Sequence, residues 1–138
     1  MKQRNRCLVG TLLLLAMLVA FAVPALAVSN QVIYLPSGQT WVNTNAVTRT
    51  GNYSYASARN HSVYPSSGTD EYELIQCCVV NSGGTRLSEK TYVTLNETDA
   101  GYTKIDLREG YLSYTTIIFR FRGNSTNSAY AVVSYLPN

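Results

Sequence analysis

Once residues 1–27 are set aside, this chain has no excess of charge of either sign. It has 138 residues with 11 basic and 8 acidic side chains, and the first 27 residues hold three of the basic ones, Lys2, Arg4 and Arg6. The remaining 111 residues (138 − 27) carry 8 basic (11 − 3) and 8 acidic side chains, so their formal net charge is zero. A neutral domain lacks the electrostatic footprint of DNA-binding or RNA-binding proteins and has no acidic solvating tail. We therefore expect no nucleic acid among its partners.

Cysteine is scarce as well. Beyond residue 27 the only cysteines are the adjacent pair Cys77 and Cys78, whose side chains point to opposite faces if the segment is a strand. Two such thiols cannot bridge each other without a strained turn, so the sequence predicts no intrachain disulfide framework. We interpret them first as small apolar residues, of which at least one is buried. An interchain bridge and a vicinal redox switch are the alternatives.

The chain also lacks the residue sets that common catalytic sites need. His61 is the only histidine, and no Gly-x-Ser-x-Gly elbow accompanies it. Glu71 and Glu73 would share one face of a strand, and glycosidases place two carboxylates across a cleft. A solvated strand entry explains this pair equally well. We therefore predict a protein that is not an enzyme.

Metal ligands are few. One histidine and two oppositely directed cysteines do not make a zinc site, which needs three or four ligands. Asn96, Glu97 and Asp99 offer oxygen atoms that suit Ca²⁺, but their spacing is not that of an EF-hand loop. We expect no metal and no cofactor.

Residues 1–27 have the pattern of a secretory signal peptide. A basic start precedes the uncharged apolar run 8–23, which is followed by Pro24 and by the small residues Ala25 and Ala27. This pattern predicts a signal-peptide helix that is removed after Ala27, a secreted protein, and no membrane contact after cleavage. An uncleaved anchor is the alternative, because the apolar run is nearly long enough to span a bilayer.

Residues 28–138 are expected to form a single domain, because their number suits one core. They are rich in β-branched and aromatic residues, and short runs of these alternate with Gly, Pro, Asn and Ser clusters. The runs predict an all-β fold, either a small antiparallel β-sandwich or a jelly roll of about seven to eight strands. A closed barrel is the alternative. The expected strands are 31–35, 40–50, 53–64, 72–80, 85–97, 102–107, 111–122 and 129–136.

Alternation within two of these runs predicts which side chains are buried. In 111–122, Ile117, Phe119 and Phe121 share one face, and we expect that face to lie on the core side. The run 72–80 is apolar on both faces, which predicts a bulge or a covered edge.

Tyrosine is the most informative residue type, with 11 in the chain. Tyr53, Tyr55, Arg59 and His61 lie at alternate positions of one expected strand and would share a face, opposite small alanines. Aromatic rings with a hydroxyl group suit sugar rings and cell-wall polymers. We predict these four residues as ligand contacts, with Trp41 as an outlying aromatic. The alternative is that the tyrosines pack the outer sheet faces.

Taken together, the sequence predicts a small secreted, non-enzymatic β-sandwich that binds carbohydrate or a cell-envelope polymer at or outside the cell surface. A bacteriocin-like or toxin-like effector and an extracellular assembly subunit are alternatives, as is a hydrolase that uses Glu71 and Glu73. The sequence leaves the oligomeric state open.

Overall fold

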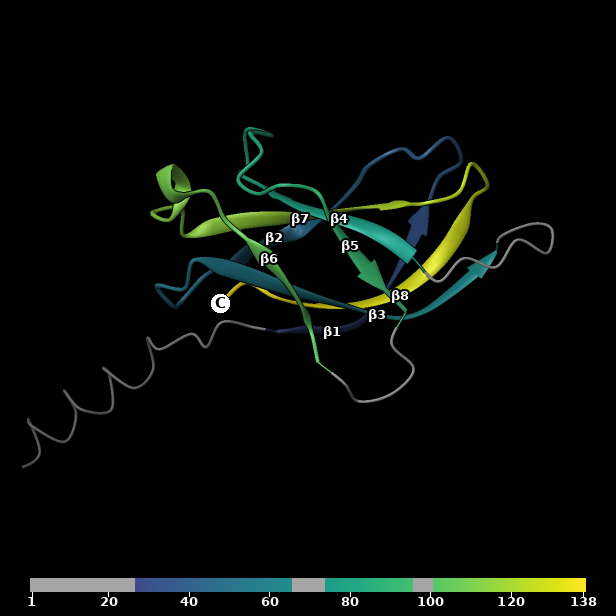
Figure 1. Ribbon diagram of the computed structural model, residues 1–138, viewed down its shortest axis with the longest axis horizontal. Coiled ribbons are helices and arrows are strands. Elements are labelled where there is room, and N and C mark those ends of the chain that lie inside the picture. Colours follow the sequence, from purple (N-terminus) through teal and green to yellow (C-terminus); the bar gives the residue numbers. More distant parts are fainter. Residues whose placement is uncertain (1–26, 66–73, 96–100) are drawn as a thin grey trace, which may run out of the picture.

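The computed structural model describes residues 27–65, 74–95 and 101–138. These residues form eight strands and one short 3₁₀ helix (Figure 1). The strands are β1 (Val28–Leu35), β2 (Val42–Thr48), β3 (Tyr55–Pro65), β4 (Leu74–Val80), β5 (Thr91–Thr94), β6 (Thr103–Asp106), β7 (Thr116–Gly123) and β8 (Ala129–Leu136), and the 3₁₀ helix is η1 (Glu109–Tyr111).

The strands form two four-stranded antiparallel sheets, in the orders β1-β8-β3-β6 and β2-β7-β4-β5. Figure 1 shows them as two layers, with β1, β3 and β8 below β2, β4 and β7. Each strand pairs with the strand at the mirrored position of the chain, β1 with β8, β2 with β7, β3 with β6 and β4 with β5. The all-β class and the two antiparallel sheets predicted from the sequence are confirmed. The closed-barrel alternative is wrong, because the strands belong to two separate sheets.

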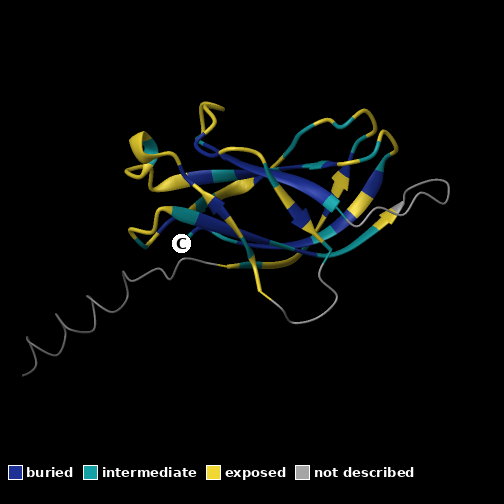
Figure 2. Ribbon diagram, in the orientation of Figure 1, coloured by how far each residue is buried: buried dark blue, intermediate teal, exposed yellow. Residues whose placement is uncertain are grey.

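The inner faces of the two sheets share one core (Figure 2). Phe119 and Phe121 of β7 are fully buried, and the buried Tyr135 of β8 packs against both from the opposite sheet. The ring centroids of Phe119 and Tyr135 are 4.7 Å apart. Large aromatic side chains contribute most of the apolar area in a small core, so this group joins the two layers. The predicted inward face of 111–122 is correct for Ile117, Phe119 and Phe121.

Register shifts interrupt three strands, namely β1 (between Val28 and Gln31), β2 and β3. In β3 the pairing with β8 shifts between Asn60 and Ser62, so His61 is the extra residue. In β2 a shift follows Asn43, and the hydroxyl of Thr44 there accepts a hydrogen bond from the backbone N–H of Phe119 at 3.2 Å. The β3 bulge lets both ends of that long strand present apolar side chains to the core, Ala56 at one end and Val63 at the other.

Several of the expected strands differ from the structure in extent, most of all 85–97 and 111–122. The expected strand 85–97 is regular only over β5, because residues 85–90 form only isolated bridges, Arg86 with Val80 and Ser88 with Leu107. The expected strand 111–122 begins only at Thr116, because η1 occupies the residues up to Tyr111. Neither the bulge nor the covered edge expected for 72–80 is found in β4, whose register with both neighbours is unbroken and which lies between β7 and β5.

Arg49 ties the ends of the two sheets together. It follows β2, is only 6% exposed, and donates hydrogen bonds from its guanidinium group to five backbone carbonyls. Two of these carbonyls follow β8 in the other sheet, and the rest lie in the loops that precede β3 and β7. The acceptors are Tyr53, Leu112, Tyr114, Pro137 and Asn138. A buried guanidinium group satisfied in this way stabilises the fold rather than binding a ligand.

Candidate functional site

Of the predicted contacts, Tyr55 is the first residue of β3, on the outer side of the β1-β8-β3-β6 sheet, and Tyr53 lies in the segment directly before it. Tyr53 is exposed, and its ring centroid is 5.6 Å from that of Tyr55. The ammonium group of Lys104 in β6 lies 4.8 Å from the Tyr55 ring centroid and forms an ion pair with Asp106 at 2.9 Å. One face of Tyr55 is therefore already in contact with a cation.

Arg59 lies on the outer face of β3, because Ala58 next to it points into the core, and His61 is the bulge residue of the same strand. His61 Nε2 lies 2.7 Å from the hydroxyl oxygen of Ser134 in β8. That oxygen also accepts a hydrogen bond from the backbone N–H of Asn30 in β1 at 3.0 Å.

Desolvation, and then the charge of Arg59, lower the pKa of His61. His61 is therefore a neutral group at neutral pH, with both hydrogen-bonding roles available on its ring.

Three tyrosines that the sequence interpretation did not single out form a row across the same face. Tyr34 of β1 pairs with Tyr130 of β8, which pairs with Tyr64 of β3. Their side chains are 47%, 46% and 58% exposed, and the rings of Tyr34 and Tyr130 have centroids 5.3 Å apart. The only sequence signal for these three tyrosines is that each of them lies next to a core residue of its own strand. Their alignment depends on the pairing of β8 with both neighbours, which one strand's alternation does not reveal.

We call this row, with its neighbours Val32 and Val132, the tyrosine face. Val32 is 62% exposed and pairs with Val132, two residues along each strand from Tyr34 and Tyr130. No charged residue belongs to it. It offers flat apolar rings with hydroxyl groups at their ends, which is the chemistry that stacks on and hydrogen-bonds to a polyhydroxylated ring.

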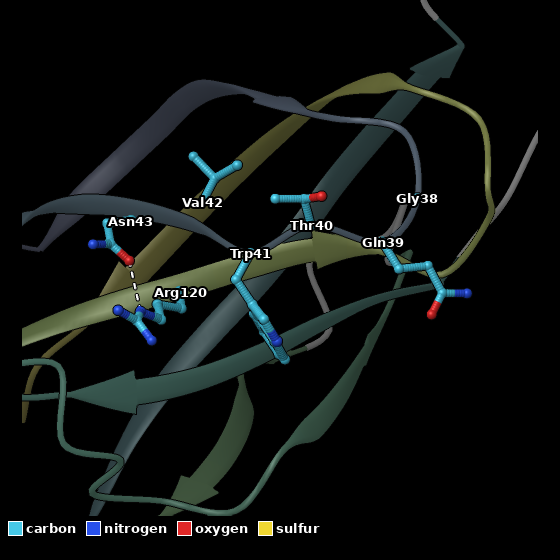
Figure 3. A pocket seen from close by; sticks show the side chains of 7 residues that line it. All are labelled: Gly38, Gln39, Thr40, Trp41, Val42, Asn43 and Arg120. Atoms are coloured by element: carbon cyan, nitrogen blue, oxygen red, sulfur yellow. Dashed lines mark hydrogen bonds between the residues drawn. The ribbon is translucent and has the colours of Figure 1, made fainter.

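Trp41 does not join the other predicted contacts. It precedes β2 in the other sheet, where the guanidinium carbon of Arg122 lies 4.7 Å from the indole ring centroid. It lines an open pocket of about 710 Å³ together with Gln39, Thr40, Asn43 and Arg120, among others. Figure 3 shows the bond between Asn43 and Arg120 beside the indole ring.

Cys77 and Cys78 point to opposite sides of β4, and neither forms a disulfide. Cys77 is 0% exposed in the core and Cys78 is 1% exposed on the outer side. Burial raises the pKa of both thiols, well above its ordinary value for Cys77. Reactive cysteines are exposed and have lowered pKa values, so this placement favours the interpretation as packed residues over the redox and interchain alternatives.

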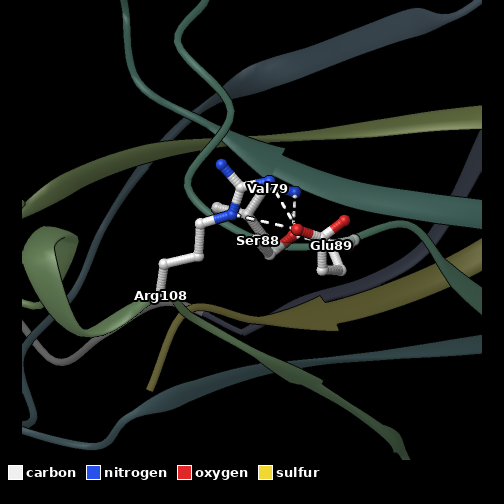
Figure 4. A network of polar contacts seen from close by, with 4 residues as sticks. All are labelled: Val79, Ser88, Glu89 and Arg108. Atoms are coloured by element: carbon white, nitrogen blue, oxygen red, sulfur yellow. Dashed lines mark hydrogen bonds and ion pairs between the residues drawn. The ribbon is translucent and has the colours of Figure 1, made fainter.

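A second, smaller pocket has its charges already paired. It has a volume of about 410 Å³ and contains the pairs Lys104–Asp106 and Arg108–Glu89. Figure 4 shows Arg108 against Glu89, and next to them Ser88, whose hydroxyl accepts a hydrogen bond from the backbone N–H of Val79 at 2.9 Å. The pocket therefore has no unpaired charge with which to attract an ion.

Several predictions concern residues that the structure does not describe. The predicted signal peptide lies outside the described residues except for Ala27, and so do Glu71 and Glu73 and the group Asn96, Glu97 and Asp99. Within the described ranges, no group of His, Cys, Asp and Glu is arranged to hold a metal ion. The same ranges contain no helix with the length and apolar character needed to cross a membrane.

Comparison of the chain with protein-family models, with curated proteins and with solved structures finds no match.

Proposed function

We propose that this protein is a small exported β-sandwich with jelly-roll connectivity that binds a glycan or cell-envelope polymer through its tyrosine face. The observation that carries the proposal is the alignment of Tyr34, Tyr130 and Tyr64 across three adjacent strands, all exposed on one side of a sheet. The mirrored strand pairing of the two four-stranded sheets supports the jelly-roll connectivity, since an eight-stranded double sheet is the form that this fold takes.

The dimensions of the surface suit an extended ligand. Neighbouring strands are about 4.8 Å apart, so the tyrosine row covers about 10 Å across the sheet. Along β3, the outward residues from Tyr55 to Tyr64 cover about 26 Å at about 3.3 Å per residue, with the bulge residue left out. The Tyr and His side chains on this path offer stacking and hydrogen bonds, and the path also carries the charges of Arg59 and of Lys104 over Tyr55.

Binding rather than catalysis is the proposed activity. The partner of His61 is the hydroxyl group of Ser134, which is 2% exposed and already accepts a backbone hydrogen bond. A nucleophile has to reach its substrate and needs an oriented base. The geometry of this pair therefore supports a structural role in holding the sheet surface.

Export is part of the proposal and rests on the sequence pattern of residues 1–27. An exported location would place the tyrosine face among extracellular polysaccharides and envelope polymers, which supply the ligand class that its chemistry favours.

The test is retention of the purified protein on an array of neutral glycans and cell-wall polymers. The double variant Tyr64→Ala with Tyr130→Ala should lose retention by about tenfold or more, because two stacking platforms disappear. Tyr53→Ala with Tyr55→Ala tests the contribution of the other end of β3.

Tyr92→Ala is the matched control, since Tyr92 is 50% exposed but lies on the other sheet. Retention that survives the loss of Tyr64 and Tyr130, in a variant with unchanged circular dichroism, would refute the site. A blank array for the wild-type protein would refute the function and would favour the effector and assembly alternatives.

A further inference from the structure

The outer face of the β2-β7-β4-β5 sheet carries a group of positive charges. Arg120 and Arg122 are two residues apart on β7 and point outward, because Phe119 and Phe121 point into the core. Arg86 follows β4 and forms a bridge with Val80, at the end of that strand. We call these three side chains the arginine face.

Neutral groups hold two of these arginines in place. Arg120 donates a hydrogen bond from Nε to Asn43 Oδ1 at 2.6 Å, and Arg122 donates one from Nε to Gln76 Oε1 at 2.8 Å. Gln76 is itself fixed, because it donates to Asn124 Oδ1 at 2.7 Å. Since both of these anchors use the Nε atom, the terminal Nη groups of the two guanidinium ions stay available for a second partner within the part of the chain that the structure describes.

No carboxylate among the described residues pairs with the arginine face. Strands β2, β4, β5 and β7 contain no Asp or Glu at all. All three arginines act electrostatically on the Cys78 thiol, which pairs in register with Arg120, so the three charges lie around one point of the sheet. Like charges held together in this way repel one another, and a bound anion relieves that repulsion.

We propose that the arginine face, together with the Trp41 pocket, binds an acidic polysaccharide through its sulfate, phosphate or carboxylate groups. Guanidinium groups bind such oxyanions in bidentate geometry and more strongly when they are partly buried, as Arg120 and Arg122 are. This site lies on the opposite side of the molecule from the tyrosine face and does not rest on the function proposed above.

The surroundings of the charges favour a sugar polymer as the carrier of the anion. The pocket that contains Arg120 is also lined by Trp41 and by the polar side chains of Gln39, Thr40 and Asn43, which suit a ring with hydroxyl groups. Gly84, at a φ of 83°, places no side chain over Arg120: a Cβ there would lie 3.6 Å from its Nη2 atom.

Trp41 is the only tryptophan of the chain, so its fluorescence reports on this site alone. We would titrate the purified protein with dextran sulfate, polygalacturonate and neutral dextran, and with an oligothymidylate as the nucleic-acid probe. The sulfated and carboxylated polymers should change the Trp41 emission in a saturable way, and neutral dextran should not. The ratio of the two affinities identifies which oxyanion the site prefers.

The variant Arg86→Gln with Arg120→Gln should weaken dextran sulfate binding by about tenfold or more, because charge-assisted contacts are lost. Arg120→Lys, which keeps the charge but not the fork geometry, should have an intermediate effect. The control is Arg108→Gln, since Arg108 is already paired with Glu89. All variants are compared at equal circular dichroism and melting temperature.

Three results would overturn the proposal. The first is an unchanged Trp41 emission with both acidic polymers. The second is an equal loss of affinity in Arg108→Gln, which would indicate a response to total charge rather than to this face. The third is equally tight binding of neutral dextran or of the oligothymidylate, which would remove the acidic polysaccharide as the ligand class.

Discussion

The two outer surfaces of this small domain have opposite chemistry although their inner surfaces are alike. The outer face of the β1-β8-β3-β6 sheet presents Tyr34, Tyr64 and Tyr130 in register, and the outer face of the β2-β7-β4-β5 sheet presents Arg120 and Arg122. Inward residues are constrained by close packing in both sheets. Outward residues are less constrained by packing, so the chemistry of the two outer surfaces can differ. The ligands proposed for the two surfaces differ accordingly.

The two surfaces also show that a domain with no net charge can have its charged side chains unevenly distributed. Residues 28–138 have a formal net charge of zero, yet the four strands of one sheet hold two arginines and no carboxylate. A neutral total therefore excludes a uniformly basic domain but not a local anion site.

The largest expected effect comes from breaking the link between the two sheets at Arg49. Arg49→Met removes a buried guanidinium group and leaves several carbonyls without a donor, each of which costs about 1–3 kcal/mol when it stays buried. We expect the free energy of unfolding in urea to fall by about 3–5 kcal/mol, and both proposed binding activities to weaken together. Arg108→Met, at an exposed ion pair, should cost no more than about 1 kcal/mol. A loss of unfolding free energy in Arg49→Met that is smaller than the loss in Arg108→Met would contradict the role of Arg49 in joining the two sheets.

The second-largest expected effect concerns Cys77 and Cys78, which lie on the inner and outer sides of β4. Cys77→Ser places a hydroxyl group in the apolar core and should cost about 2 kcal/mol in urea unfolding. Cys78→Ser should cost under about 1 kcal/mol, because Arg86, which hydrogen-bonds the Cys78 side chain, can bond the new hydroxyl. Equal costs at both positions would show that the outer side of β4 is as apolar as the core.

Much of the fold could be predicted from the sequence, because alternation and turn residues act locally. The strand 129–136 was predicted with its observed limits, and the inward side of Phe119 and Phe121 followed from the period of two. The start of β7 was wrong because Tyr111 and its neighbours form a 3₁₀ turn, whose short-range hydrogen bonds leave no periodic signal.

The candidate sites were less predictable, because each is assembled by strand pairing. Tyr55, Arg59 and His61 lie in β3 and Tyr53 directly precedes it, so they could be grouped without any strand pairing, although the bulge at His61 interrupts the alternation. The alignment of Tyr34 with Tyr130 joins residues far apart in the chain. The contact of Trp41 with Arg122 likewise depends on strand pairing, here of β2 with β7. Pairing register depends on all eight strands at once and is not encoded in any single segment.

A smaller effect, on binding alone, separates the two faces. Tyr64→Ala with Tyr130→Ala should weaken neutral glycan retention by about tenfold, or about 1.4 kcal/mol, and leave the Trp41 response to dextran sulfate unchanged. Arg86→Gln with Arg120→Gln should do the reverse. Because packed sheets lie about 10 Å apart, the combined variant should show the sum of the two free-energy changes. A departure from additivity beyond about 0.5 kcal/mol would mean that the faces are coupled through the core.

The smallest expected effect is the pH dependence contributed by His61 on the side of the tyrosine face. Desolvation and the charge of Arg59 lower the pKa of folded His61, whereas the unfolded chain titrates near the ordinary value of about 6.5. As the pH falls below that value, the unfolded state binds the proton first, so stability that is complete above pH 6.5 is lost as the pH falls through the folded pKa. His61→Gln should therefore reduce the difference in unfolding free energy between pH 7.5 and pH 5.5, and Arg59→Gln should reduce it less, because desolvation is the larger cause. An unchanged difference in His61→Gln would show that other groups account for the acid sensitivity.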